Sequence, residues 1–312
     1  MIQVELNRRT EFVQIKEFYS YCGGLPAPEI AGNPLAFKFS WSPRGALMSQ
    51  DNAASFLSGG KLVDIPADEL MKTARPYHVM DGYSFVAYPN RNSVPFREFY
   101  GIPEADTVIR GSLRYEGNPS FVQALKELGF LDQSEKDWLR EGITWREILQ
   151  KMTGAKSADK VSSQVKKKCL FSSESEAERI IKGLEWMGLF STEPATARGN
   201  LLDTLCAQLE KLVSYQPGER DLVMLQHKFV VEWKDGKKDT ITSTLELYGD
   251  PNGYSAMARS VGVTCGIGSQ LVLDGHAAFS APGVWAPYRQ DICDPIRERL
   301  EREGIRMVEK TL

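Results

Sequence analysis

The sequence predicts an α/β fold: a mixed α+β sheet with covering helices and an inserted all-helical subdomain. Segments of β-branched and alternating apolar residues occur up to residue 117 and again from residue 219. Residues 118–218 show helical periodicity instead. We therefore expect an α/β domain formed by residues 1–117 and 219–312, with a helical subdomain at 118–218.

An early stretch, residues 18–45, is expected to be a shaped loop that forms the wall of a pocket. Gly23, Gly24, Pro26 and Pro28 favour backbone turns over helix or strand. Ordered loops on rigid scaffolds often carry function, which favours the pocket. A tight surface connection is the alternative, and the residues leave both open.

The rest of the first region is predicted to alternate strands and short helices. Pro89 ends one strand, and the polar turn that follows has Arg91 at its centre. A later β-branched strand carries Arg110 and Arg114 on either side of a glycine. The predicted elements are strands at 12–20, 61–65, 83–88 and 107–115, and helices at 44–57 and 67–73.

Amphipathic helices are predicted throughout the middle region. Thr144 is followed three residues later by Glu147, the spacing of a capping box at a helix start. The three lysines at 166–168 are interpreted as a solvated helix face. The predicted helices cover residues 120–131, 137–140, 144–152, 174–189 and 200–215.

Strands are predicted to resume in the last region. Asp235 and Gly236 form a typical hairpin turn between two of them. A helix rich in small residues at 255–273 is suited to close packing, including packing against a second domain. The predicted strands cover 221–227, 229–234, 239–248 and 305–308, and the last helix starts at Asp294 and Pro295 and covers 296–303.

The composition indicates a soluble globular protein with 42% hydrophobic and 25% charged residues. The net charge of −3 argues against a nucleic-acid binder, which usually has a basic face. No apolar run has the length needed to span a bilayer, and the N-terminus has no signal-peptide core. The five cysteines are widely spaced and form no CxxC pair, which predicts reduced thiols in a cytoplasmic protein and no metal site.

No familiar catalytic or phosphate-binding motif is present. Cys22 is interpreted as a small packing residue, because none of the three histidines lies in a recognisable catalytic motif. The glycine-rich residues 262–268 have the wrong spacing for a dinucleotide site and lie within a helical pattern, so they are interpreted as packing residues. The sequence also lacks a P-loop, HExxH and GxSxG.

Arginines at strand ends are the clearest candidate binding residues. Arg91, Arg110 and Arg114 are expected to converge on one edge of the sheet. Arginine binds carboxylates in a planar, bidentate way, so several arginines predict a small ligand with more than one carboxylate. Ordinary surface salt bridges are an equally good explanation of the spacing alone.

Several longer motifs together resemble the saccharopine dehydrogenases of the NADP-dependent, L-glutamate-forming type, also called saccharopine reductases. The resemblance covers almost the whole chain and is greatest to the fungal enzymes of lysine biosynthesis. The motifs are SYCGGLPAPE at 20–29, NPLAFKFSWSPRG at 33–45, YPNRNS at 88–93, TVIRGSLRYEG at 107–117, ERDLVMLQHKF at 219–229, STLELYGD at 243–250 and GYSAMARSVG at 253–262.

The resemblance implies an activity and its reactants. The family joins L-glutamate to α-aminoadipate semialdehyde and reduces the resulting imine with NADPH, giving saccharopine. This product carries three carboxylates, in agreement with the arginine-rich turns and strands. The resemblance also implies a homodimer built from a Rossmann-type cofactor domain, an α/β substrate-binding and dimerisation domain, and a small helical domain.

Individual roles follow from the matched motifs. Arg91 is expected to bind a substrate carboxylate, and Ser42 to reach the NADP. No general acid or base is singled out. The residues expected to line the substrate pocket are Ser112, Leu113 and Arg114, with Tyr21 and Cys22 close to both ligands.

The sequence departs from the family at its start, because the N-terminal cofactor domain is expected to be absent. We therefore expect NADP binding by this chain alone to be weak or missing. Residues 262–268 also differ from the family pattern, and the C-terminal end is expected to pack on a cofactor domain. The alternative hypothesis is a catalytically inert substrate-binding or dimerisation module, and the residues do not fix the reaction direction.

Overall fold

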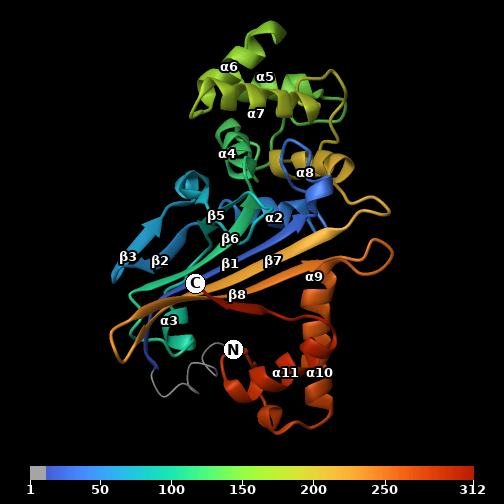
Figure 1. Cartoon of the computed structure of the whole chain (residues 1–312). Coiled ribbons are helices and arrows are strands. Elements are labelled where there is room, and N and C mark those ends of the chain that lie inside the picture. The colour runs from blue at the N-terminus through green and yellow to red at the C-terminus, as the bar shows by residue number, and fades with distance from the viewer. Residues whose placement is uncertain (1–11) are drawn as a thin grey trace.

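A mixed sheet forms the centre of the computed structural model, which describes residues 12–312 (Figure 1). The strands that the structure describes lie in the order β3-β2-β6-β1-β7-β8-β9, and β5 pairs with both β4 and β6. Only β1 and β6 run parallel to each other within this part of the chain. The strands are β1 (Phe12–Pro26), β2 (Ala54–Ser58), β3 (Lys61–Ile65), β4 (Arg75–Pro76), β5 (Phe85–Pro89), β6 (Thr107–Tyr115), β7 (Asp221–Trp233), β8 (Lys238–Tyr248) and β9 (Val308–Thr311).

The prediction that residues 18–45 form a loop is wrong for its first part, because β1 continues to Pro26. Gly23 and Gly24 lie inside this central strand, where neighbours leave no room for a side chain. A Cβ at Gly23 would lie 2.9 Å from the carbonyl oxygen of Leu113, and one at Gly24 would overlap the Met257 side chain. Glycine here allows close approach within a sheet, which local propensity does not distinguish from a turn.

The helix predicted at 44–57 is also only partly correct. The helix α2 (Pro43–Ser49) ends early, and the following residues form β2 and β3. These strands make a hairpin through Gly59 and Gly60, which adopt φ of 55° and 77°. The apolar residues at 53–57 fit a helical pattern, but cross-strand pairing with β3 determines their conformation. Residues 67–73 form the predicted short helix, as the 3-10 helix η2 (Ala67–Thr73).

Five α-helices between β6 and β7 gather at one end of the sheet (Figure 1). The capping box is confirmed, since Thr144 and Glu147 exchange both hydrogen bonds at the start of α5. The helix predicted at 137–140 is wrong, because these residues form turns, and the bounds of the helix containing Lys166 were not predicted. The helices are α4 (Asn118–Leu128), α5 (Trp145–Thr153), α6 (Val161–Lys168), α7 (Glu174–Trp186) and α8 (Leu201–Leu212).

The core of these helices is continuous with the core beside the sheet. Leu125, Ile148, Leu184 and Leu202 are fully buried and belong to the same hydrophobic cluster as Leu113 of β6. The lysines at 166–168 are exposed in the last turn of α6, as predicted. The division into domains at residues 118 and 218 stays a prediction.

The C-terminal region folds back against one face of the sheet (Figure 1). It contains α9 (Ala256–Ala258), a π-helical turn (Arg259–Val263), α10 (Thr264–Leu273) and α11 (Gln290–Arg302). The predicted start of the last helix at Pro295 is wrong, because Pro295 lies inside α11. Ile292, in the first turn of α11 before Pro295, is buried and packs this turn against the protein. The terminal strand is β9, three residues later than predicted, because Ile305 and Met307 pack against the cluster of Val223 instead.

Side chains alternate between two chemically different faces of the sheet. We call one the arginine face, defined by Arg110, Ser112 and Arg114 of β6 with Ser20 and Cys22 of β1 and His227 of β7. We call the other the tyrosine face, defined by Tyr19, Tyr21, Tyr77, Tyr83, Tyr115 and Tyr248. No helix in the part of the chain that the structure describes is both long and apolar enough to cross a membrane.

Candidate functional site

Two hydrophobic clusters cover the ends of the arginine face and leave its middle row of polar side chains between them. At one end, Phe18 and Val108 pack with Phe96 of α3 (Phe96–Phe99) and with Tyr100, which directly follows this helix. At the other end, Val223 and Leu245 pack with α9. The pairing of the strands brings the polar residues together: Arg110 pairs with Ser20, Ser20 with His227, and Ser112 with Cys22.

Arg114 is a buried cation without a counter-ion. Its side chain is 6% exposed, its Nη1 donates to the carbonyl oxygen of Leu113 at 2.7 Å, and its Nε has no hydrogen-bond partner. Its Cζ lies 5.0 Å from the ring centroid of Phe37 and 6.0 Å from that of Tyr88. No carboxylate within residues 14–312 forms an ion pair with it. Burying an unpaired charge is costly, so this site is suited to an anionic ligand.

Arg110 is held by an aromatic side chain rather than by an acid. Its Cζ lies 3.8 Å from the ring centroid of Phe96, within cation–π range. The structure records no ion pair for Arg110 among the residues it describes. Ser112 lies between the two arginines on the same face. This strand therefore presents two positive charges and a hydroxyl in a row.

Cys22 is next to Ser112, and its side chain is exposed, so the prediction of a packing residue is wrong. Although solvent reaches the thiol, the surrounding protein desolvates it and raises its pKa, while the charge of Arg114 acts in the opposite direction. The raised pKa favours the protonated thiol at neutral pH. Cys22 is therefore poorly suited to act as a nucleophile in this state.

His227 is a neutral, partly buried neighbour of Ser20. Burial lowers its pKa to about 4, and the positive charge of Arg110 contributes to the same shift. Its Nδ1 is buried without a hydrogen-bond partner, and its ring stacks on Phe18 with centroids 6.0 Å apart. At neutral pH it adds a polar group but no charge to the arginine face.

Arg91 lies in the predicted turn after β5, but the structure does not bring it into contact with Arg114. It is exposed, has a left-handed φ of 55°, and its carbonyl accepts from the Ser55 amide at 2.9 Å. This conformation is uncommon for a residue with a side chain and concentrates at ligand-binding turns. Pro89 pairs with Gly111 and the Asn90 amide donates to the carbonyl oxygen of Arg110 at 2.9 Å, so the turn that carries Arg91 lies beside Arg110.

The other predicted site residues divide between the two faces. Tyr21 and Leu113 direct their side chains to the tyrosine face, away from Cys22 and Ser112. Ser42 is exposed at the start of α2, and its side chain makes no capping hydrogen bond. The structure therefore brings together the side chains of Cys22, Ser112 and Arg114, but not those of Tyr21 and Leu113.

Sequence reasoning missed Tyr88 and His227. Tyr88 precedes Pro89, pairs with Ser112 and is 2% exposed, yet its hydroxyl has no partner. The only sequence signal for Tyr88 is the alternation of side chains along the strand that precedes the turn with Arg91. Nothing in the sequence distinguishes His227 from the other histidines. Among residues 14–312 no group of histidine, cysteine and acidic side chains is arranged to hold a metal ion.

Comparison with known proteins gives a consistent result. The chain matches the saccharopine dehydrogenase C-terminal domain family over residues 2–305. It is 49% identical to a saccharopine dehydrogenase (NADP+, L-glutamate-forming) of Schizosaccharomyces pombe, over 96% of this chain and 67% of that protein. It is 36% identical to the mitochondrial alpha-aminoadipic semialdehyde synthase of Bos taurus, over 93% of this chain and 31% of that protein.

A solved structure shows the same fold. The apo histidine-tagged saccharopine dehydrogenase (L-Glu forming) of Saccharomyces cerevisiae superimposes with a TM-score of 0.92 and 46% identity. The match covers 99% of this chain and 69% of that chain, so this chain spans about two thirds of the fungal proteins it matches. The chain therefore belongs to the saccharopine dehydrogenase family, and it corresponds to the C-terminal domain of that family.

Proposed function

We propose that this chain carries the saccharopine-binding part of an NADP-dependent, L-glutamate-forming saccharopine dehydrogenase of lysine biosynthesis. The observation that supports this most strongly is Arg114, a buried guanidinium with a free Nε and no acidic partner in the described chain. A molecule that bears several carboxylates supplies the missing charge. Family membership identifies saccharopine as the ligand to test first.

The residues of the arginine face would bind and orient the substrate. Arg114 would hold one carboxylate by charge-assisted hydrogen bonds, with Ser112 as a neighbouring donor. Arg91, at the far end of the same strand pair, would hold another carboxylate. Cys22 adjoins the bound molecule, while Tyr21 and Leu113 contribute through their backbone. Fixing the imine in one orientation is the contribution of these residues to the reaction.

NADPH supplies the hydride when it is bound, and the described residues fit only part of its site. Ser42 offers an exposed hydroxyl beside Trp41, whose ring reaches the Gly24 position. No glycine-rich turn joins a strand to a helix in the way a dinucleotide requires anywhere in residues 12–312. We therefore assign Ser42 to the edge of the cofactor site and no further residue to it.

The apolar surface of α10 supports docking of a cofactor domain. Leu271 is the only buried residue of this helix, whereas Val272 and Leu273 are 54% and 80% exposed. A Cβ at Gly262, Gly266 or Gly268 would meet no atom within 4 Å, so these small residues pack against nothing in the described chain. Close packing of a second domain against this helix accounts for both features.

A catalytically inert binding or dimerisation module is the second candidate. The exposed α10 surface and the incomplete cofactor site favour it for the chain acting alone. Homodimer formation and a cytoplasmic location are proposals that come from the family resemblance.

Two measurements on the purified chain separate these candidates. Calorimetry is used to titrate saccharopine, and NADPH oxidation is followed with L-glutamate and α-aminoadipate semialdehyde. Saturable saccharopine binding with NADPH oxidation supports the enzyme, and binding without oxidation supports the inert module. Absence of saccharopine binding would contradict both the enzyme and the inert substrate-binding module, leaving only a dimerisation module.

A further inference from the structure

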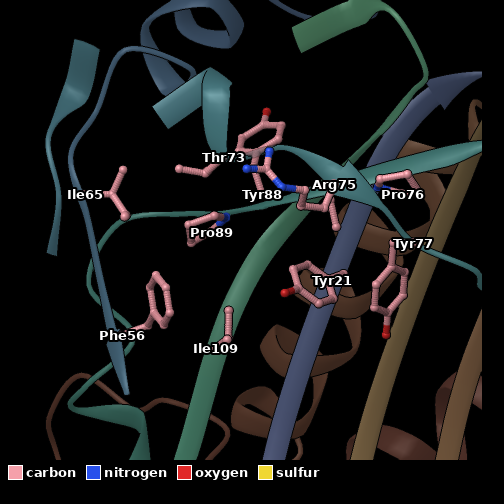
Figure 2. A pocket seen from close by; sticks show the side chains of 11 residues that line it. Tyr21, Phe56, Ile65, Thr73, Arg75, Pro76, Tyr77, Tyr88, Pro89 and Ile109 are labelled. Atoms are coloured by element: carbon pink, nitrogen blue, oxygen red, sulfur yellow. The ribbon is translucent and has the colours of Figure 1, made fainter. Parts of the chain in front are cut away.

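A separate cavity opens on the tyrosine face, on the side of the sheet opposite the arginine face. It has a volume of about 210 Å³ and lies where β2 and β5 diverge along the same edge of β6 (Figure 2). The segment from η2 to Tyr77 borders it, and Tyr21 and Ile109 form its floor on β1 and β6. The sheet therefore separates this cavity from Cys22, Ser112 and Arg114.

Most of the cavity wall is apolar or aromatic. Phe56, Ile65 and Ile109 lie on one side of it, and Pro76 and Tyr77 lie on the other (Figure 2). A cavity of about 150 Å³ with such a lining accommodates a benzene ring, so this one has room for a ring and a small substituent. The lining thus favours a ligand with a compact apolar body.

Two polar groups at the cavity retain unused hydrogen-bonding capacity. Arg75 donates through Nη1 to the carbonyl oxygens of Lys72 and Ala74, at 2.7 Å and 2.8 Å, and forms no ion pair within the described residues. Figure 2 shows its guanidinium directed toward Thr73. The Tyr21 hydroxyl points into the cavity and has no hydrogen-bond partner in the described chain.

Two further polar groups at the cavity are already satisfied. The Thr73 hydroxyl donates to the carbonyl oxygen of Leu70 at 2.6 Å, and the Tyr77 hydroxyl donates to Oε1 of Gln226 at 3.0 Å. None of the lining residues is acidic. A ligand here thus finds one guanidinium and one hydroxyl for an anionic group, but no carboxylate for an ammonium group.

We propose that this cavity binds a small monocarboxylate with an aromatic or branched apolar body and no amino group. Its ring packs between Phe56, Ile109 and Tyr77, and its carboxylate accepts from Arg75 and the Tyr21 hydroxyl. The site is distinct from the arginine face, so it is occupied independently of saccharopine. Tyr21 is adjacent to Cys22 on β1, which gives the bound molecule direct contact with a strand of the arginine face.

Benzoate is the probe that tests this proposal, with benzyl alcohol as its uncharged counterpart. Calorimetry of the chain is expected to show saturable benzoate binding, with benzyl alcohol about tenfold weaker because it lacks the charge-assisted hydrogen bonds. Arg75→Gln is expected to weaken benzoate binding about tenfold, and Ile109→Trp to abolish it by filling the cavity. Arg140→Gln is the matched control, because this exposed arginine also donates to a backbone carbonyl.

The outcomes are distinct from those for the proposed function. Saccharopine titrated in the presence of saturating benzoate is expected to keep its stoichiometry, which places the two ligands at separate sites. Absence of saturable benzoate binding would overturn the proposal. So would benzoate binding that Arg75→Gln and Ile109→Trp leave unchanged, or binding that saccharopine displaces competitively.

Discussion

The two faces of the central sheet differ in whether their polar groups have hydrogen-bond partners within the protein. On the tyrosine face, the hydroxyls other than that of Tyr21 are paired within the protein, for example Tyr77 with Gln226, Tyr83 with Glu246 and Tyr115 with the carbonyl oxygen of Pro26. On the arginine face, the Nε of Arg114, the hydroxyl of Tyr88 and the Nδ1 of His227 are buried without partners.

This difference distinguishes polar groups that stabilise the fold from polar groups that are available to bind a ligand. A buried polar group without a partner destabilises a protein by about 1–3 kcal/mol, so a set of them on one face needs an explanation. A ligand that pairs with Arg114 provides one. The tyrosines whose hydroxyls are paired, in contrast, act as part of the core against which they pack.

The largest expected effect tests the arginine face directly. Arg114→Gln removes the buried cation and is expected to weaken saccharopine binding by about 100-fold, since a charged hydrogen-bonded contact is lost. Calorimetry on both proteins measures this, with Arg140→Gln as the control. Unchanged affinity in Arg114→Gln would remove this residue from the site.

A glycine of β6 on the tyrosine face gives the next largest effect. A Cβ at Gly111 would overlap the carbonyl oxygen of Tyr88 and lie 2.5 Å from the Tyr21 ring. Gly111→Ala is therefore expected to lower the free energy of unfolding by about 1–3 kcal/mol. Urea denaturation measures it against Gly45→Ala, where no atom lies within 4 Å and a small gain in helix stability is expected.

Removing one hydroxyl from each face compares them most closely. Tyr77→Phe leaves the Oε1 of the buried Gln226 without its donor and is expected to cost about 1–2 kcal/mol of unfolding free energy. Tyr88→Phe removes a hydroxyl that has no partner and is expected to be neutral or slightly stabilising in the absence of ligand. Equal losses in the two variants would contradict the distinction between the faces.

The pKa of His227 predicts a pH dependence. Burial lowers this pKa from 6.5 to about 4, so below pH 6.5 the unfolded chain binds a proton that the folded chain does not bind until about pH 4. The free energy of unfolding therefore falls as the pH drops through this window, by about 1–3 kcal/mol from this group, and is insensitive to it above the window.

Urea denaturation at a series of pH values measures this slope. His227→Gln is expected to flatten it, while the matched substitution His78→Gln, at an exposed position, leaves it in place. An unchanged slope in His227→Gln would show that His227 does not titrate with the shifted pKa.

The smallest effect is expected at the exposed end of the site. Arg91→Ala is expected to weaken saccharopine binding about fivefold, because solvent screens an exposed charge more than the buried Arg114. Calorimetry against wild type measures the change. If Arg91→Ala proves more damaging than Arg114→Gln, the main carboxylate contact lies in the turn and not on the sheet.

The sequence predicted the parts of the fold that local patterns determine. The strand at 107–115 was predicted to the residue, and the capping box at Thr144 marked a helix start correctly. The strand through Gly23 and Gly24 was missed, since glycine signals a turn unless the close neighbour Leu113 is known. The start of the last helix was predicted too late, at Pro295, because the buried Ile292 stabilises a helical turn before this proline.

The candidate site was predictable to a similar degree. Their positions at strand ends indicated Arg91 and Arg114, the family resemblance added Ser112, and the alternation of β6 explains why Ser112 and Arg114 share a face. Tyr88 and His227 were missed because their importance depends on burial without a partner. That property arises only when β5, β6 and β7 assemble.

The central claim is that Arg114 binds a carboxylate of saccharopine on the arginine face. A crystal structure of the chain with saccharopine tests it most directly. The account predicts a carboxylate oxygen within hydrogen-bonding distance of the Arg114 Nε, which has no partner in the free chain. Saccharopine bound elsewhere, with the Arg114 guanidinium still unpaired, would contradict it.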